Sequence, residues 1–229
     1  MIELNIILKK VVLMKNFAFV SDFDGTISLK DFYHIIIDKY LGDEGKNFYQ
    51  DWKKTKKINV EFLNKIFSSI KLDEKELHKE IFKIPVDKNA IKLIEEVKKR
   101  DGDFYILSAG TSYYIKILLD YLNINDIEII SMKGIYINGG IKIIPNEDSL
   151  YYSSIFGIDK GKVIEDLKSS YKEVFFAGDS EPDFQAAKKA DLAFGKSELK
   201  DILKKEDISF IPFRDFSEII NHMEERGWF

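Results

Sequence analysis

Apolar and polar positions follow three different patterns along the 229-residue chain. Residues 17–20 (FAFV) form a short continuous apolar run, which predicts a buried, parallel strand. Apolar positions then recur at helical spacing in four successive segments, 31–42, 46–54, 59–70 and 73–84, and Asp73 is a candidate N-cap of the last. From residue 85 onward, helical and strand patterns alternate.

The alternating region predicts how the sheet is built. We expect helices over 87–102, 111–124, 161–171, 181–190 and 216–229, and strands over 103–110, 127–131, 173–180, 192–195 and 207–212. Residues 134–144 are predicted as a hairpin, because Asn138-Gly139-Gly140 favours a tight turn between two apolar runs. Strands that alternate with helices are typical of βαβ units, so the predicted fold class is α/β with a doubly wound parallel sheet.

These patterns divide the chain into a core of residues 14–29 and 85–229 and a helical insertion of residues 30–84. Residues 1–13 form an N-terminal extension that is too short to span a bilayer and has no small-residue cleavage site. Two interpretations of this extension stay open. Either the protein starts at Met14, or the extension supplies an extra strand or a contact to a second copy.

Composition narrows the classes of partner. Hydrophobic residues make up 45% of the chain and charged residues 32%, which is typical of a globular protein with material for a core. The net charge of −4 provides no basic surface for nucleic acid or an anionic membrane, and we expect neither as a partner. The absence of cysteine excludes disulfides and thiolate metal sites and favours a cytoplasmic location. Composition does not indicate an oligomeric state.

Two aspartates come directly after the first predicted strand. Asp22 and Asp24 are separated by one residue, so the alternation of side chains places both carboxylates on the same side, where they repel each other. Taken alone, the pair is equally typical of a turn, because Asp and Gly are common turn residues. The polar residues that follow the other strands decide between these interpretations.

Parallel strands bring their carboxyl ends to one edge of a sheet, where ligands of such folds bind. The residues expected at this edge are Asp22 and Asp24; Ser108, Ala109 and Gly110; Lys160; and Asp179 and Asp183. Each is individually explained as a helix cap or a solvated charge. If these individual explanations held, the common location of the residues would require four independent coincidences. We therefore expect the residues to form one site.

The residue types of this site indicate its chemistry. An acidic cluster of Asp22, Asp24 and Asp179 is tolerable only around a hard cation, and oxygen ligands without cysteine suit Mg²⁺. Ser108, the backbone N–H groups around Gly110 and Lys160 are suitable donors to phosphate oxygens. A metal and phosphate donors at one site predict phosphoryl transfer from a small phosphorylated molecule.

Four segments resemble the haloacid dehalogenase-like phosphatases over nearly the whole chain from Met14: DFDGT at 22–26, ILSAG at 106–110, Lys160, and GDSEPD at 178–183. The helical insertion is similar to the small helical cap of the phosphoserine phosphatase-like branch. Within that branch, the overall plan most resembles the methionine-salvage phosphatases, which act on 2-hydroxy-3-keto-5-methylthiopentenyl-1-phosphate.

The resemblance implies a role for each matching residue. Asp22 is the nucleophile that forms an aspartyl-phosphate, and Asp24 is the general acid and then the general base. The implied Mg²⁺ ligands are Asp22, the main-chain carbonyl of Asp24, and Asp179, whereas Asp183 orients metal-bound water or Lys160. The implied phosphate-binding residues are Ser108, Ala109, Gly110 and Lys160. Gly25 permits a sharp turn and Thr26 fixes the loop.

The insertion is expected to carry substrate specificity. Asp31 lies where the phosphoserine phosphatase branch places an acid for the substrate amine, and it is equally placed to cap the first helix of the insertion. That branch uses a cap arginine for the substrate carboxylate, whereas Arg100, Arg214 and Arg226 all lie outside residues 30–84. This departure disfavours phosphoserine and favours a neutral or sugar-like phosphate.

Two other functions share the same residue types. A phosphomutase would keep the phosphate and return it to the substrate, and the motifs do not separate it from a phosphatase. A receiver domain or a catalytically silent relative would bind or accept phosphate without turnover. A receiver domain needs no helical insertion after the first strand and lacks the paired aspartates. Every polar role that catalysis requires is filled by a residue of this chain, which favours an enzyme.

Overall fold

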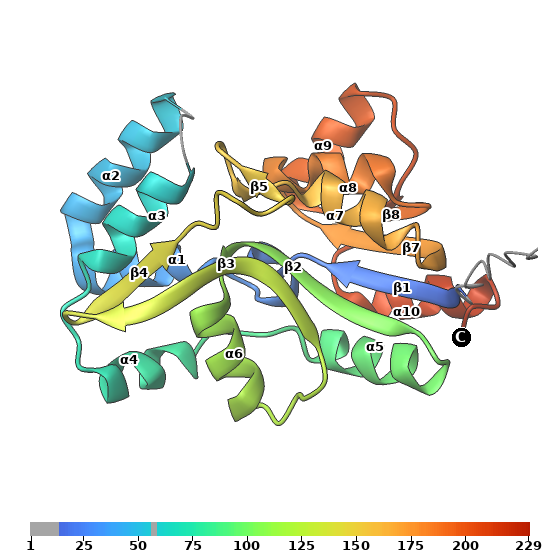
Figure 1. Ribbon diagram of the computed structural model, residues 1–229, viewed down its shortest axis with the longest axis horizontal. Helices are drawn as coiled ribbons and strands as arrows, with labels where there is room; N and C mark the ends of the chain where they lie inside the picture. Colours follow the sequence, from blue (N-terminus) through green and yellow to red (C-terminus); the bar gives the residue numbers. More distant parts are fainter. Residues whose placement is uncertain (1–13, 56–58) are drawn as a thin grey trace, which may run out of the picture.

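The computed structural model describes residues 14–55 and 59–229, and the expected extension of residues 1–13 lies outside the described residues. Within these residues, a seven-stranded sheet has the order β4-β3-β2-β1-β7-β8-β9 (Figure 1). Its strands are β1 Lys15–Ser21, β2 Asp103–Thr111, β3 Glu128–Ile137, β4 Gly140–Ile144, β7 Tyr171–Gly178, β8 Leu192–Gly195 and β9 Ile211–Pro212. In this sheet only the β3–β4 pair is antiparallel, so the predicted α/β fold with a doubly wound, mostly parallel sheet is confirmed.

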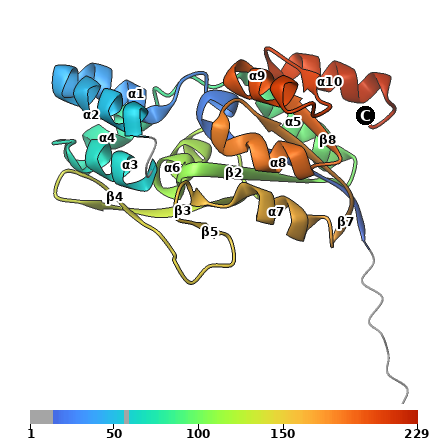
Figure 2. The same cartoon turned by 90° about the horizontal axis from the view of Figure 1, so that it is seen from above.

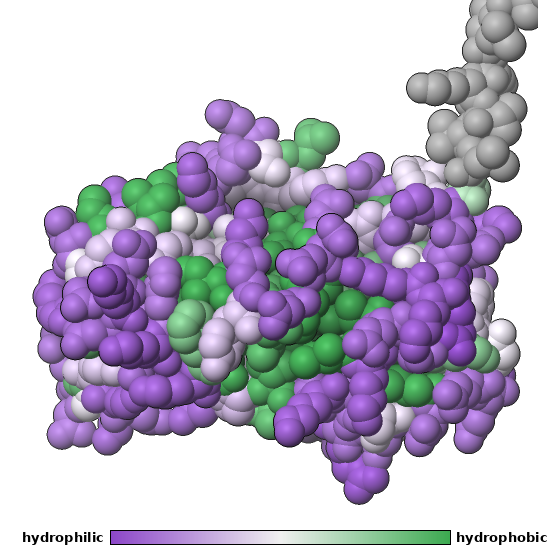
Figure 3. All heavy atoms as spheres, turned by 90° about the horizontal axis from the view of Figure 1, so that it is seen from below, coloured by the Kyte–Doolittle hydropathy of each residue, from purple (hydrophilic) through white to green (hydrophobic). Residues whose placement is uncertain are grey.

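Helices cover the sheet on two sides. Helices α7 Lys160–Leu167, α8 Phe184–Lys189 and α9 Ser197–Lys205 lie above it in Figure 1, and α5 Lys88–Lys99 and α6 Ser112–Tyr121 lie below it. Helix α10 Phe216–Glu225 packs beside α5 (Figure 2). Seen from below, apolar side chains form a patch bordered by polar ones (Figure 3). The short strands β5 Tyr152–Ser153 and β6 Gly157–Ile158 pair with each other in the loop before α7.

The centre of the core is strand β1, which is hydrogen-bonded on both edges and buried on both faces. The ring of Phe19 stacks between those of Phe104 in β2 and Phe194 in β8, at centroid distances of 5.5 and 6.0 Å. Continuous apolar sequence was expected for such a strand, because no residue of a covered parallel strand faces water. Burial of β1 fixes the position of Asp22, the residue that follows it.

The helical insertion comprises α1 Phe32–Ile36, a π-helical turn Ile37–Leu41, α2 Gly42–Thr55, α3 Asn59–Ser68 and α4 Glu74–Ile81, on the left in Figure 1. Asp73 caps α4 as expected, because its carboxylate accepts the Glu76 N–H at 2.8 Å and the two residues form a capping box. The division into a core and an insertion of residues 30–84 stays a prediction.

The hairpin of β3 and β4 contacts the insertion. The Asn64 side chain of α3 accepts the Ile143 N–H at 2.7 Å and donates to the Ile143 carbonyl at 3.2 Å. The turn lies where expected, since Asn138 and Gly139 both have positive φ, 52° and 86°. A Cβ at Gly140 would lie 2.4 Å from the Phe67 carbonyl oxygen, so glycine is what allows this close approach.

Two sequence-based strand predictions differ from the structure. Residues 127–131 and the first arm of the hairpin form one continuous strand, β3, rather than two. Gly134 allows β3 to lie close to β2 at this point. A Cβ at position 134 would lie 2.3 Å from Thr111 Oγ1, so a larger residue would push the two strands apart. The last strand pairs only over Ile211–Pro212 instead of residues 207–212. None of the helices in the described part of the chain is both long and apolar enough to cross a membrane.

Candidate active site

Asp22 begins the site at the carboxyl end of β1. Its backbone N–H bonds to the Ala177 carbonyl of β7 at 2.9 Å, which holds the residue at the edge of the sheet. The residue is 4% exposed, and Oδ1 accepts a hydrogen bond from Lys160 Nζ at 2.7 Å. Oδ2 is buried and has no hydrogen-bond partner among the described residues. An unpaired buried carboxylate oxygen is costly unless a ligand satisfies it.

Lys160 is the cation that contacts Asp22. It is the first residue of α7, its side chain is 1% exposed, and Nζ also donates to Asp183 Oδ1 at 2.6 Å. Burial alone would lower the pKa of Lys160, but the charges of Asp183 and Asp22 outweigh burial and raise the pKa. The two carboxylates therefore favour the charged form of Lys160, which links β1 to the loop after β7.

Asp183 is fully engaged by donors. Besides Lys160, it accepts the backbone N–H groups of Asp179 and Ser180 on Oδ2, at 2.9 and 3.1 Å. Gly178 makes room for it, because a Cβ at that position would lie 2.7 Å from the Asp183 carboxylate. These contacts leave Asp183 little capacity for a further ligand and fit the expected orienting role.

Asp179 faces the first loop of the site. A Cβ at Gly25, which has φ of 78°, would lie 2.5 Å from Asp179 Oδ2, so the turn requires glycine for both conformation and space. Thr26 Oγ1 lies 3.4 Å from Asp179 Oδ1, at the long end of a hydrogen bond. Burial, followed by the charges of Asp183 and Asp31, raises the pKa of Asp179 to about 8.

These carboxylates fit a divalent cation. One oxygen each from Asp22, Asp179 and Asp183 lies within 4.8 Å of the others. Burial, together with the charges of Asp183 and Asp179, raises the pKa of Asp22 well above its ordinary value. A cation between Asp22 Oδ2 and Asp179 would relieve this repulsion and satisfy the unpaired oxygen. Oxygen-only ligands are the set that Mg²⁺ prefers.

Asp24 is held on both carboxylate oxygens. The backbone N–H of Phe32 donates to Oδ1 at 3.1 Å, and the hydroxyl of Tyr114 donates to Oδ2. Ser108 Oγ lies 3.4 Å from the same Oδ2. Burial, and then the charge of Asp31, raises the pKa of Asp24 to about 7, although the bonds from Tyr114 and Phe32 oppose the shift. A carboxyl group with such a pKa can give and take a proton near neutral pH.

Ser108, Ala109 and Gly110 lie in β2 where it leaves its partner strand. The pairing of β2 with β3 is interrupted between Leu107 and Thr111. Backbone groups in the interruption are released from the ladder, and the Gly110 N–H bonds to Ser108 Oγ at 2.9 Å instead. Ser108 is fully buried beside Asp24, and its expected role as a donor to phosphate stays a prediction.

Asp31 does not cap the first helix of the insertion. It precedes α1 at the N-cap position, but its side chain makes no capping hydrogen bond. Oδ1 lies 3.1 Å from the Cβ position of Gly25, which places the carboxylate beside the Asp22–Thr26 loop. Burial raises the pKa of Asp31, against the opposing effect of a hydrogen bond from Tyr33. The capping interpretation of Asp31 is therefore not supported, and its contact with a substrate stays a prediction.

Two residues of the site were missed by sequence reasoning. Lys196, directly after β8, is 9% exposed and donates from Nζ to the Thr26 carbonyl at 3.1 Å. Its position after a parallel strand was an available signal, because the same rule had identified the other groups. Tyr114 lies within a predicted helix, six residues after Ser108, and the apolar pattern of that helix marked it only as core.

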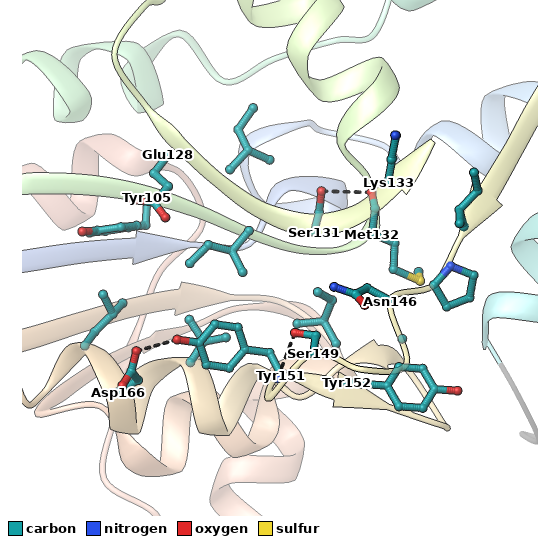
Figure 4. Close-up of a pocket in the computed structure, with 18 residues that line it drawn as sticks. Tyr105, Glu128, Ser131, Met132, Lys133, Asn146, Ser149, Tyr151, Tyr152 and Asp166 are labelled. Atoms are coloured by element: carbon teal, nitrogen blue, oxygen red, sulfur yellow. Dashed lines mark hydrogen bonds between the residues drawn. The ribbon is translucent and has the colours of Figure 1, made fainter. Parts of the chain in front are cut away.

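A cavity of about 640 Å³ lies elsewhere, between β3 and α7 (Figure 4). Its lining includes Tyr105, Ser131, Tyr151 and Asp166, and the Tyr151 hydroxyl donates to Asp166. None of the expected site residues lines it. The converging carboxylates and donors, rather than the volume of this cavity, therefore define the candidate active site.

Comparisons with known proteins show the family of this chain. The family model described as haloacid dehalogenase-like hydrolase matches residues 19–188. A 2-hydroxy-3-keto-5-methylthiopentenyl-1-phosphate phosphatase of Bacillus cereus is 27% identical over 89% of this chain and 94% of its own. The polyol phosphate phosphatase PYP1 of Saccharomyces cerevisiae is 28% identical over 90% and 91%.

Solved structures share the fold. A phosphoserine phosphatase with an analogue of the phospho-aspartyl intermediate has a TM-score of 0.67 and 22% identity over 91% of this chain and 99% of its own. A substrate-bound phosphoserine phosphatase has a TM-score of 0.68 and 21% identity over 91% and 98%. The expected family and the expected hydrolase class are thus confirmed. The chain belongs to the haloacid dehalogenase-like hydrolases.

Proposed function

We propose that this protein is a Mg²⁺-dependent phosphatase that hydrolyses a small phosphorylated metabolite through an aspartyl-phosphate on Asp22. The observation that carries the proposal is the state of the Asp22 carboxylate. One oxygen is held by Lys160 and the other is buried and unpaired, at the edge where Asp24 and Ser108 converge. The curated relatives named above are phosphatases, which supports the same activity.

The residues present support a two-step reaction. In the first step an Asp22 oxygen attacks phosphorus, the bond from phosphorus to the leaving oxygen breaks, and Asp24 gives its proton to that oxygen. In the second step a water attacks phosphorus and loses its proton to Asp24, while the bond from phosphorus to Asp22 breaks. Lys160, Ser108 and the N–H groups of the β2 interruption hold the phosphate oxygens throughout.

Asp22, Asp179 and the main-chain carbonyl of Asp24 are the proposed Mg²⁺ ligands. When bound there, the cation neutralises the charge between the Asp22 carboxylate and an anionic substrate. Asp183 serves by orientation, because its two oxygens already accept three hydrogen bonds. Asp183 thereby fixes Lys160 and the loop that carries Asp179.

Residues 30–84 are proposed as a cap over this site. The Phe32 N–H contacts Asp24, and Asp31 lies beside the nucleophile loop, so the start of the insertion is part of the site. Residues 30–84 contain no arginine, which leaves no bidentate partner for a substrate carboxylate. The half-buried acceptor Asp31 suits a substrate hydroxyl or amine instead. A neutral, hydroxylated phosphate therefore fits better than phosphoserine.

Phosphate release from a panel of phosphorylated metabolites tests the function. The panel contains phosphoserine, polyol phosphates, 2-hydroxy-3-keto-5-methylthiopentenyl-1-phosphate and 4-nitrophenyl phosphate, each with Mg²⁺ and with EDTA. We expect release only with Mg²⁺ and a preference for a neutral, hydroxylated substrate. Release from none of these compounds with Mg²⁺ would contradict the proposal, and transfer without release would indicate a mutase.

Substitution of the nucleophile tests the mechanism. Asp22→Asn should reduce kcat by about 10³-fold or more, because removal of a nucleophile abolishes the covalent route. Asp43→Asn is the matched control, since the Asp43 side chain is 95% exposed on α2 and should leave kcat unchanged. Full Mg²⁺-dependent activity of the Asp22→Asn variant would show that another group attacks phosphorus.

A further inference from the structure

A buried tyrosine hydroxyl lies directly on the proposed acid–base group. Tyr114 in α6 is 1% exposed, and its O–H donates to Asp24 Oδ2. Gly110 leaves the space for this contact, because a Cβ at Gly110 would lie 2.0 Å from the Tyr114 hydroxyl oxygen and 2.9 Å from Asp24 Oδ2. The glycine of the phosphate-binding segment therefore also makes room for a hydrogen bond to Asp24.

Packing fixes the position of this hydroxyl. The Tyr114 ring lies among three phenylalanine rings, those of Phe23, Phe32 and Phe67, at centroid distances of 6.0, 4.9 and 5.9 Å. A ring enclosed in this way keeps one rotamer, so the O–H stays directed at the carboxyl group. Tyr114 is thus a rigid donor rather than a mobile one.

The carboxyl group of Asp24 has one donor for each oxygen. The Phe32 N–H is 3.1 Å from Oδ1, and Tyr114 occupies Oδ2. Two donors on different oxygens define the plane of a carboxyl group, whereas one donor would leave rotation about the Cβ–Cγ bond free. Ser108 is a weaker restraint, since its Oγ is 3.4 Å from Oδ2.

We propose that Tyr114 is a positioning residue that holds Asp24 in the orientation needed to protonate the leaving oxygen of the substrate. This inference rests on the phosphatase function proposed above. Proton transfer requires the acid within hydrogen-bond reach of the leaving oxygen and correctly aligned. Loss of the hydroxyl leaves Asp24 in place but free to turn away.

The effect of a Tyr114 substitution on kcat/KM should depend on the leaving group of the substrate if Tyr114 positions the acid, but not if Tyr114 only stabilises the fold. Phenol has a pKa of about 10, like a tyrosine side chain, so phenoxide leaves poorly without a proton. The oxygen of 4-nitrophenol leaves readily as the anion and needs little help from an acid. The kcat/KM value reports the steps up to departure of the leaving group. A variant with a misaligned acid should therefore lose kcat/KM on phenyl phosphate and keep it on 4-nitrophenyl phosphate.

The test compares Tyr114→Phe with Tyr113→Phe. The neighbouring tyrosine is a matched control, because its hydroxyl donates to Glu74 at 3.1 Å and does not contact Asp24. For Tyr114→Phe we expect kcat/KM with Mg²⁺ to fall about 10- to 100-fold on phenyl phosphate, which is a part of the rate enhancement that a general acid provides. On 4-nitrophenyl phosphate we expect kcat/KM to fall less than about 3-fold. Tyr113→Phe should stay within about 2-fold of the wild type on both.

Equal losses of kcat/KM on the two substrates, or no loss on either, would overturn the role of Tyr114 while leaving the phosphatase function intact. An inactive wild-type enzyme would overturn both. If the Phe variant does not fold, Tyr114→Met provides the same comparison, because a flexible apolar side chain fills the space without a hydroxyl. Activity of either variant on 4-nitrophenyl phosphate shows at the same time that the site is assembled.

Discussion

Replacing Lys160 with methionine tests the electrostatic organisation of the site directly. Lys160 is the buried cation that contacts Asp22 and Asp183, at 2.7 and 2.6 Å. Methionine keeps a long apolar stem of similar length and removes only the ammonium group. The variant would leave a group of buried carboxylates without the charge that compensates them, so we predict a large loss of stability in the absence of metal.

The magnitude follows from the burial of the pair. Removal of one partner from a buried, hydrogen-bonded ion pair costs about 3–5 kcal/mol, because the other charge stays buried and uncompensated. For a chain of this length, each kcal/mol lowers Tm by about 2–4 °C, so Lys160→Met should lower Tm by about 10 °C. Protonation of the carboxylates limits the loss at low pH.

The sign of the pH dependence can be worked out from Asp179. Its folded-state pKa is raised to about 8, so the folded state binds a proton that the unfolded state has released at neutral pH. The contribution of this bound proton to the free energy of unfolding is complete at low pH and is lost as the pH rises through the folded-state pKa. The charge of Lys160 opposes this shift, so Lys160→Met should raise the pKa of Asp179 further and make the deficit larger at pH 8 than at pH 6.

Thermal unfolding in EDTA at both pH values measures these effects, with Lys162→Met as the control. Lys162 lies two residues further along α7, and its side chain is 55% exposed. Its Nζ lies 3.8 Å from Asp159, so loss of this ion pair should lower the free energy of unfolding by under about 0.5 kcal/mol. Equal Tm values for the two variants, or a larger deficit for Lys160→Met at pH 6 than at pH 8, would refute the reasoning. Added Mg²⁺ should restore part of the deficit, because the cation compensates the same carboxylates.

Two further substitutions test neighbouring features. Gly178→Ala places a Cβ 2.7 Å from the buried Asp183 carboxylate, so we expect a loss of about 1–3 kcal/mol in urea unfolding and a lower kcat, and a wild-type result would show that Asp183 can move freely. In the insertion, burial acts to raise the pKa of Glu80, but hydrogen bonds from Lys39 and Lys83 outweigh it and lower the pKa to about 2. This stabilisation is present above pH 4.5 and is lost toward pH 2, so Glu80→Gln should cost about 1 kcal/mol at pH 7 and less at pH 3. An equal cost at both pH values would contradict that assignment.

The residues of the charged centre were predictable because a single topological rule places them. Asp22 and Asp179 directly follow parallel strands and Ser108 lies in the last part of one, and parallel strands share one carboxyl edge. Sequence alone therefore brings them together without knowledge of any side-chain contact. The same rule includes Lys196, which was missed because a single lysine after a four-residue strand resembles a solvated charge.

Other features depend on packing that no local pattern records. The continuity of β3 depends on the close approach of Gly134 to Thr111, two residues that are far apart in the sequence. The hydrogen bonds between Asn64 and Ile143 depend on how α3 meets the hairpin. A helical pattern predicts which face of α6 is apolar, but the direction of the Tyr114 hydroxyl is set by the phenylalanine rings that enclose it.

Asp24 is the point at which the helical insertion and the sheet meet. One oxygen is held by the Phe32 backbone of the insertion and the other by Tyr114, which follows the phosphate-binding segment of β2. The Phe32 ring also packs on the Tyr114 ring, so a displacement of α1 would disturb both donors together. The proposed phosphate donor Lys160 instead hydrogen-bonds to Asp22 and Asp183, outside the insertion. Changes in the insertion should therefore affect proton transfer by Asp24 before they affect phosphate binding.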